Sequence, residues 1–336
     1  MRKQYLHKKV FIIAAFIIIL LAICWVFMHR PVATPYEKHG ALSVKDGKLL
    51  DCHGEDVQLK GVSTHGLAWF PEYVNKEAFQ TLRDRWGANV IRLSLYTESY
   101  GGYVNGGDPE KLRSIIDQGV QYCTELGMYC IIDWHILNDG DPNTHKSEAK
   151  QFFYQMVYRY GNQGNVLFEI CNEPNGDTTW RQVQTYAYSV LKVIRRRSPR
   201  SIVIVGTPNW SRDVDIAARH PLKGQKNIMY AFHVYAASHK DEMRRKLKTA
   251  LALHLPVFIT EIAICESSGN GEIDKTSGNE WKEIIQKHHI SWCAWNLSNK
   301  DEACALIKPN VKKTSAWFYW DLTEDGKWIR GLMRSR

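Results

Sequence analysis

The stretch Asn165-Val-Leu-Phe-Glu-Ile-Cys-Asn-Glu173-Pro174 places a glutamate at the end of a run of apolar and aromatic residues. A second stretch, Leu255-Pro-Val-Phe-Ile-Thr-Glu261, has the same form. Such runs, bounded by Gly or Pro, are typical of strands that are buried on both faces. We therefore expect Glu173 and Glu261 at the mouths of two buried strands. A glutamate that merely ends a strand and faces water is the simpler interpretation, and the surrounding pattern argues against it.

The same pattern repeats along the chain. Apolar runs that predict strands occur at 57–64, 89–95, 129–134, 166–172, 201–206, 228–234, 256–260 and 290–295. Helical patterns lie between them, at 76–86, 109–126, 146–160, 178–197, 213–219, 241–254 and 277–289. Eight alternating units in about 250 residues predict an α/β fold of the (β/α)8 TIM-barrel type with a parallel sheet. A doubly wound open sheet is the main alternative, but no G-x-G-x-x-G motif follows the first strand.

The N-terminus differs from the rest of the chain. Val10–Met28 carries no charge, and four Lys or Arg residues precede it while one follows. At about 1.5 Å per residue, this segment can just span a bilayer core of about 30 Å. The charge asymmetry predicts a cytoplasmic tail at 1–9, a transmembrane signal-anchor at 10–28, a linker at 29–45, and a single catalytic domain at 46–336 outside the cytoplasm. Cleavage of the segment and secretion is the alternative.

Charge and cysteine content restrict the function further. The net charge is +9, but the first 30 residues hold five of the 44 Lys and Arg residues and no acid, which leaves 39 against 35 acids in the remainder. This is an ordinary solvated surface and does not indicate a nucleic-acid partner. The eight cysteines form no CxxC and no zinc-like spacing. We expect Cys130, Cys171, Cys265 and Cys293 to be buried as small hydrophobic residues. We expect no metal or cofactor, and a monomer. Whether the chain forms one or two disulfides is left open.

Polar or aromatic residues stand at all eight predicted strand ends, where barrels of this kind carry their active sites. These residues are His65, Arg92, Asp133 with His135, Asn172 with Glu173, Trp210, His233 with Tyr235, Glu261, and Trp295 with Asn296. A lone histidine there is usually a core residue, but the whole set indicates a site.

Two carboxylates, one to donate a proton and one to attack, are the minimum for retaining glycoside hydrolysis. Glu173, beside apolar neighbours, suits the acid with a raised pKa. Glu261 suits the nucleophile if Arg92 lies near enough to keep it ionised.

Tryptophan points to the substrate class. Of 12 Trp residues, Trp69, Trp210 and Trp295 follow predicted strands, and Tyr96 lies beside them. Flat rings with polar rims suit the faces of pyranose sugars. Core packing is the expectation for four others, Trp86, Trp180, Trp281 and Trp317.

From about Leu59 to Trp317 the chain resembles glycoside hydrolase family 5, in particular its bacterial endo-β-1,4-glucanases (cellulases). The resemblance rests on Lys60-Gly-Val-Ser-Thr-His65-Gly-Leu-Ala-Trp69, Ile131-Ile-Asp-Trp-His135-Ile-Leu-Asn-Asp-Gly, Glu169-Ile-Cys-Asn172-Glu173-Pro-Asn-Gly, His233-Val-Tyr235 and Trp295-Asn-Leu-Ser-Asn-Lys300. It implies a retaining endo-glucanase that cleaves internal bonds of cellulose-type or mixed-linkage β-glucans, with carboxylates about 5–5.5 Å apart.

The resemblance also assigns residues. Glu173 would be the proton donor and general acid/base, and Glu261 the nucleophile. Their supporting residues would be Arg92, His135, Asn172, His233 and Tyr235. The substrate-binding residues would be His65, Trp69, Phe70, Tyr96, Trp210, Ser267, Ser268, Trp295, Lys300, Asp301 and Glu302.

Two departures from the family pattern lie near the site, and they leave the glycan open among cellulose, lichenan, mannan and xylan oligomers. Ile262 follows the nucleophile where Trp is common, and Pro208-Asn209 replaces a smaller turn before Trp210. No carbohydrate-binding module follows the barrel, so we expect soluble or amorphous β-glucan and not crystalline cellulose.

Two other functions compete with this one. A metal-dependent barrel hydrolase would use His65, His135, Asp133 and His233, but it would want a His-x-His pair on the first strand, which is absent. A non-catalytic glycan receptor is disfavoured because both Glu residues and their supporting residues are present.

Overall fold

The computed structural model describes residues 33–335. The chain divides into two units, and the second, Pro35–Arg336, contains the fold discussed below. The predicted signal-anchor at 10–28 lies outside the described residues. Within 33–335, no helix is both long enough and apolar enough to cross a membrane.

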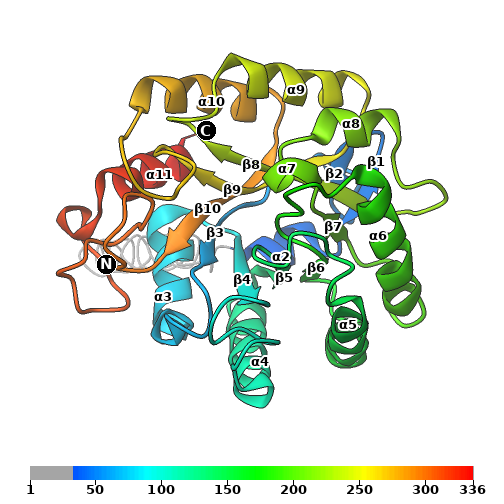
Figure 1. The fold of residues 1–336 in the computed structure, drawn as a ribbon. Helices are drawn as coiled ribbons and strands as arrows, with labels where there is room; N and C mark the ends of the chain where they lie inside the picture. Colours follow the sequence, from blue (N-terminus) through cyan, green and yellow to red (C-terminus); the bar gives the residue numbers. More distant parts are fainter. Residues whose placement is uncertain (1–32, 336) are drawn as a thin grey trace, which may run out of the picture. The chain divides into compact units, whose positions relative to one another are not determined.

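Eight parallel strands close into a barrel, which confirms the predicted (β/α)8 fold (Figure 1). The strands are β3 (Lys60–Thr64), β4 (Val90–Tyr96), β5 (Tyr129–His135), β6 (Val166–Glu169), β7 (Val203–Val205), β8 (Ile228–Tyr235), β9 (Val257–Ala263) and β10 (Ser291–Leu297). Their order around the barrel is β10-β3-β4-β5-β6-β7-β8-β9. The open sheet is therefore excluded. Because every pair is parallel, all carboxyl ends meet at one end of the barrel.

Helices surround the strands (Figure 1). They are α3 (Lys76–Thr81), continued by the π-helical turn η2 (Leu82–Trp86), then α4 (Pro109–Glu125), α5 (Lys146–Tyr160), α6 (Trp180–Arg195), α7 (Pro208–Ser211), α8 (Val214–Arg219), α9 (Asp241–Ala252), α10 (Lys275–Lys287) and α11 (Glu324–Arg334). Short 3-10 turns occur at η1 (Pro71–Tyr73) and η3 (Tyr319–Asp321). Side chains fix several helix starts. Asp108 accepts from the amides of Glu110 and Lys111, and Thr179 forms a capping box with Gln182.

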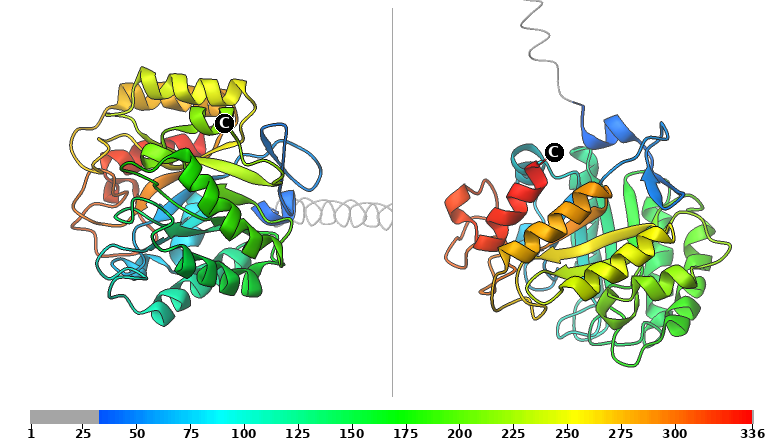
Figure 2. Two further views of the ribbon diagram at one scale, coloured as in Figure 1. Left: turned by 45° about the vertical axis from the view of Figure 1, so that its right-hand side comes forward. Right: turned by 90° about the horizontal axis from the view of Figure 1, so that it is seen from above.

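Residues just before the barrel are also structured. The predicted linker at 29–45 is described from residue 33, and there it contains α2 (Pro35–His39) and β1 (Ser43–Lys45), which pairs with β2 (Lys48–Leu50). Leu42 and Leu49 pack with the inward-facing residues at the amino ends of the strands. This segment, blue in Figure 2, thus covers the end of the barrel opposite the carboxyl ends.

The core confirms the residue-level expectations for tryptophan and cysteine. Trp86, Trp180, Trp281 and Trp317 are buried and belong to the main hydrophobic core. The four cysteines expected in strand runs are fully buried, and all seven described cysteines are free thiols. The buried charged residues of the strands are Arg92, Asp133, Glu169 and Glu261, together with the histidines His135 and His233.

Candidate active site

A cavity of about 540 Å³ opens at the carboxyl ends of the strands. Predicted site residues that line it are His65, Trp69, Tyr96, His135, Glu173, Trp210, His233, Tyr235, Glu261, Ser267, Ser268, Trp295, Lys300 and Glu302. Further lining residues come from loops that the sequence did not single out, namely Ser99, Leu137, Arg212, His239 and Gly269.

Four predicted residues are not among those that line the cavity. Arg92 and Asn172 lie beneath it and bond to residues in its wall. Phe70 packs against the His65 ring at 4.8 Å. Asp301 is exposed outside the cavity. Lys300 and Glu302, on either side of Asp301, do line the cavity, and the sugar-binding roles of Phe70 and Asp301 stay predictions.

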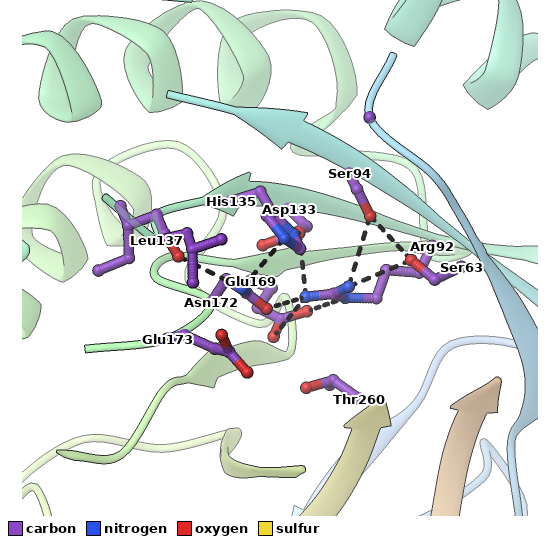
Figure 3. Close-up of polar contacts among 12 residues, drawn as sticks. Ser63, Arg92, Ser94, Asp133, His135, Leu137, Glu169, Asn172, Glu173 and Thr260 are labelled. Atoms are coloured by element: carbon purple, nitrogen blue, oxygen red, sulfur yellow. Dashed lines mark hydrogen bonds and ion pairs between the residues drawn. The ribbon is translucent and has the colours of Figure 1, made fainter. Parts of the chain in front are cut away.

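Arg92, on β4, is the centre of the polar network below the cavity (Figure 3). Its side chain is fully buried. Nε and Nη2 donate to the two oxygens of Glu169 at 2.7 and 3.3 Å, and Nη2 also lies 3.0 Å from Asp133. Nη1 donates to Glu261 Oε1 at 3.1 Å, and Nη2 to Asn172 Oδ1 at 2.6 Å. One planar guanidinium thus sets the positions of groups from β5, β6, β9 and the β6–α6 loop.

Sequence reasoning missed Glu169 and noted Asp133 only as a strand-end residue. Both are fully buried. Burial raises the pKa of Asp133 to about 7, and the pKa of Glu169 is also raised by burial while Arg92 opposes that shift. The available signal was an acidic residue at the end of an apolar run, because Glu169 is the last residue of β6. Its partner is 77 residues away in sequence, which only the closed barrel reveals.

Glu261, at the carboxyl end of β9, receives donors from two sides. Arg92 Nη1 lies 3.1 Å from Oε1, and the Tyr235 hydroxyl donates to Oε2 at 2.8 Å. Burial raises the pKa of Glu261 to about 7, while His233, Arg92 and Tyr235 act in the opposite direction. The expectation that Arg92 approaches this carboxylate is confirmed by the distance. These donors favour the ionised form of Glu261.

Glu173 has fewer charge-stabilising partners. His233 Nδ1 lies 2.7 Å from its Oε1, and His233 Nε2 lies 3.0 Å from the Thr260 hydroxyl. Burial raises the pKa of Glu173 to about 7. Oxygens of Glu173 and Glu261 lie within 4.8 Å of each other, with His233 in the same group. Two carboxyl groups this close do not readily ionise together, so the pair holds one proton near neutral pH. The donors at Glu261 favour ionisation of Glu261 over that of Glu173.

His135 is oriented by two neighbours. Its Nδ1 lies 2.6 Å from Asp133, and Asn172 Nδ2 lies 3.1 Å from its Nε2. Since Asn172 Nδ2 can only donate, we assign the proton of the neutral ring to Nδ1, where Asp133 accepts it. Burial lowers the pKa of His135 well below its usual range, which keeps the ring neutral. The Trp295 ring lies 5.2 Å from this imidazole at an interplanar angle of 15°.

A polar cluster forms one wall of the cavity. Glu302 accepts a hydrogen bond from Asn296 Nδ2 at 2.9 Å and forms an ion pair with Lys300 at 2.6 Å. His65 Nε2 lies 3.7 Å from Glu302 Oε1. These groups offer both donors and acceptors beside the Trp295 ring. Such a combination suits the hydroxyls and the apolar face of a sugar.

Two exposed tryptophans mark opposite sides of the cavity. Trp69 follows β3 and is 37% exposed, and Trp210 follows β7 and is 40% exposed. The strands β3 and β7 are four positions apart in either direction around the barrel. Both rings line the cavity, so the cavity extends across the barrel mouth between them.

Comparison with known proteins agrees with this geometry. Residues 50–301 match the model of the Cellulase family (glycosyl hydrolase family 5). The chain belongs to glycosyl hydrolase family 5. It is 46% identical to Endoglucanase A of Butyrivibrio fibrisolvens over 87% of this chain and 68% of that protein. It is 40% identical to an endoglucanase of Clostridium saccharobutylicum over 98% of this chain and 73% of that protein.

A solved structure gives the same result for the fold. The catalytic domain of a Thermobifida fusca endoglucanase superposes with a TM-score of 0.86 and 36% identity, over 90% of this chain and 100% of that one. Another structure of that domain is a complex with cellotetraose. This family 5 chain is therefore an enzyme of the endoglucanase (cellulase) group.

Replacement of Glu169 by Gln tests the buried network. Arg92 would lose its anionic partner on β6, and we expect kcat to fall by about 10- to 100-fold because the groups that it positions would shift. The charge of Glu169 is one cause that raises the pKa of Glu173. Its removal should lower that pKa, so the basic limb of kcat/KM should move to lower pH.

The control is Glu148→Gln, an exposed position on α5. Circular dichroism should show both variants folded. A Glu169→Gln enzyme with normal kcat and an unmoved basic limb would contradict the role given to Glu169.

Proposed function

We propose that the protein is a retaining endo-β-1,4-glucanase that hydrolyses internal bonds of β-glucans by double displacement. The observation that carries this proposal is the pair Glu173 and Glu261, whose oxygens lie within 4.8 Å of each other. An inverting enzyme holds its carboxyl groups about 6.5–9.5 Å apart to admit a water between them, whereas a retaining pair is about 5–5.5 Å apart. The separation supports direct attack by one carboxylate.

The unequal surroundings of the two carboxyl groups support the assignment of roles. Glu261, held by Arg92 and Tyr235, attacks the anomeric carbon, while Glu173 protonates the leaving oxygen. In the second step Glu173 removes a proton from water, which displaces Glu261. His233 contacts both carboxyl groups, at 2.7 and 3.4 Å, and so keeps their separation fixed as the proton moves.

Internal cleavage is supported by the position of Trp69 and Trp210 on opposite sides of the cavity. A glucan chain stacked on both rings would continue beyond each of them. The proposed substrate is a soluble or amorphous β-1,4-linked or mixed-linkage glucan. Cello-oligosaccharide is bound by the Thermobifida fusca relative, and the likeness to that domain supports the same class of ligand here.

A metal-dependent reaction is the second candidate, because Glu173, His233 and Glu261 could together hold an ion. The double-displacement mechanism is favoured, since Arg92 and Tyr235 already donate to Glu261. Activity that survives a chelator would support double displacement and exclude the metal-dependent reaction.

We also propose that the barrel acts outside the cytoplasm on a single-pass anchor at 10–28, with cleavage and secretion as the alternative. The support is the uncharged run and the excess of cations before it.

Chemical rescue should separate the roles of the two glutamates. Glu261→Gly and Glu173→Ala should each lose activity, by about 10²–10⁴-fold for the acid/base and by more for the nucleophile. Azide should rescue Glu261→Gly and give the α-glycosyl azide, because azide would occupy the space of the missing carboxylate and attack the anomeric carbon from that side. Azide should rescue Glu173→Ala with formation of the β product. The opposite stereochemistry would exchange the two assignments.

Substrate preference and the Trp295 platform can be measured together. Mannose carries its C2 hydroxyl axially, away from the contact expected with His135 in the cavity wall, so mannan should be cleaved more slowly than β-1,4-glucan. Trp295→Ala should cost about 1–3 kcal/mol in kcat/KM. Trp320→Ala, which changes a tryptophan 67% exposed outside the cavity, is the control.

The readouts are reducing ends and viscosity on soluble glucan. A slow fall in viscosity with release of one small sugar would indicate exo action, and faster mannan cleavage would contradict the glucanase assignment.

Topology is tested by expressing residues 31–336 alone and the full chain. The shorter protein should be soluble and active, and the full chain should fractionate with membranes. Protease added to spheroplasts should reach the barrel; protection until lysis would reverse the proposed orientation.

A further inference from the structure

A second cluster of ligating side chains lies beside the cavity, in loops that the catalytic mechanism does not use. Glu98 is in the β4–α4 loop, while Asp139 and His145 are in the β5–α5 loop. Each offers one ligand atom, and these atoms lie within 4.8 Å of one another. His145 Nε2 and Glu98 Oε2 are in direct contact. Within the described residues, the only other group of this kind is the catalytic one.

Asp139 provides an independent indication of a ligand. The residue is only 9% exposed, and its Oδ2 has no hydrogen-bond partner among the described residues. Its other oxygen is held in place, because Oδ1 accepts from the Thr97 hydroxyl at 2.6 Å and from the Leu137 amide at 3.2 Å. A buried carboxylate oxygen without a donor is costly, and a bound cation would satisfy it.

We propose that Glu98, Asp139 and His145 form a binding site for a divalent first-row transition metal such as Mn²⁺ or Zn²⁺. One imidazole nitrogen with two carboxylate oxygens is a typical donor set for these ions. Ca²⁺ takes six to eight oxygen ligands and has no use for imidazole, so this site disfavours it. The metal takes the place of the direct contact between His145 Nε2 and Glu98 Oε2.

The site would join two loops that form the cavity wall. Glu98 precedes Ser99, and Asp139 follows Leu137 by two residues; both Ser99 and Leu137 line the cavity. The carbonyl of Tyr100, in the first of these loops, accepts from Trp69 Nε1 at 3.1 Å. A metal here therefore acts structurally, by fixing the loops that carry one side of the glucan cavity, and takes no part in bond cleavage.

The test is calorimetric titration of the full chain, stripped of metal, with MnCl₂ or ZnCl₂, together with thermal unfolding. The Glu261→Gln variant is titrated in parallel, because it disrupts the catalytic group that could also bind metal. We expect one equivalent bound in both proteins, a higher unfolding temperature with metal, and much weaker binding of CaCl₂.

Replacement of a proposed ligand should weaken binding selectively. His145→Gln and Asp139→Asn should each reduce affinity at least about tenfold, whereas His220→Gln, an exposed histidine outside the cluster, should not. Three results would overturn the proposal: no binding below millimolar metal, unchanged affinity in His145→Gln, or binding that is lost in Glu261→Gln alone. Because His145 is partly exposed, its variant tests the proposal even if Asp139→Asn does not fold.

Discussion

The site depends on the burial of a single guanidinium. Arg92 is fully enclosed at the carboxyl end of the barrel and contacts the carboxylates of Asp133, Glu169 and Glu261. Removing charges from water costs several kcal/mol for each ion, and the cost is offset only when each charge has well-placed partners. The network therefore permits few geometries, and the barrel must close with β4, β5, β6 and β9 in one register for the partners to meet. The same geometry that satisfies Arg92 fixes the position of Glu261, the proposed nucleophile.

Proton distribution follows from the same arrangement. Burial raises the pKa of both Glu173 and Glu261 to about 7, and the charge of Arg92 only partly opposes this shift. Arg92 and the Tyr235 hydroxyl donate to Glu261 and favour its ionised form, whereas Glu173 contacts His233. A double displacement needs a singly protonated pair. Above this network, Trp69, Trp210 and Trp295 line the cavity, and we propose that they bind the sugar rings.

Much of this was predictable, and the exceptions have physical causes. Buried strands and amphipathic helices leave periodic apolar patterns, so the barrel was predicted from them, with α5 matching its predicted range at Lys146–Tyr160. The strands β1 and β2 have three residues each, too few for a pattern, and the glycine-containing α11 starts at a Thr323 cap that the periodicity did not reveal. Glu169 was missed because its partner Arg92 is distant in sequence. Phe70 and Asp301, which the resemblance assigned to sugar binding, do not line the cavity, and local sequence does not show on which side of a loop a side chain lies.

Covalent trapping tests the central claim most directly. The enzyme is incubated with an activated 2-deoxy-2-fluoro-cellobioside, whose fluorine slows breakdown of a glycosyl-enzyme, and the protein is analysed by mass spectrometry before and after proteolysis. The account predicts one fluoro-cellobiosyl group per chain, attached to the peptide that contains Glu261. A label on another residue would contradict the role of the Arg92 network, and an enzyme that turns the reagent over without ever carrying a label would contradict double displacement.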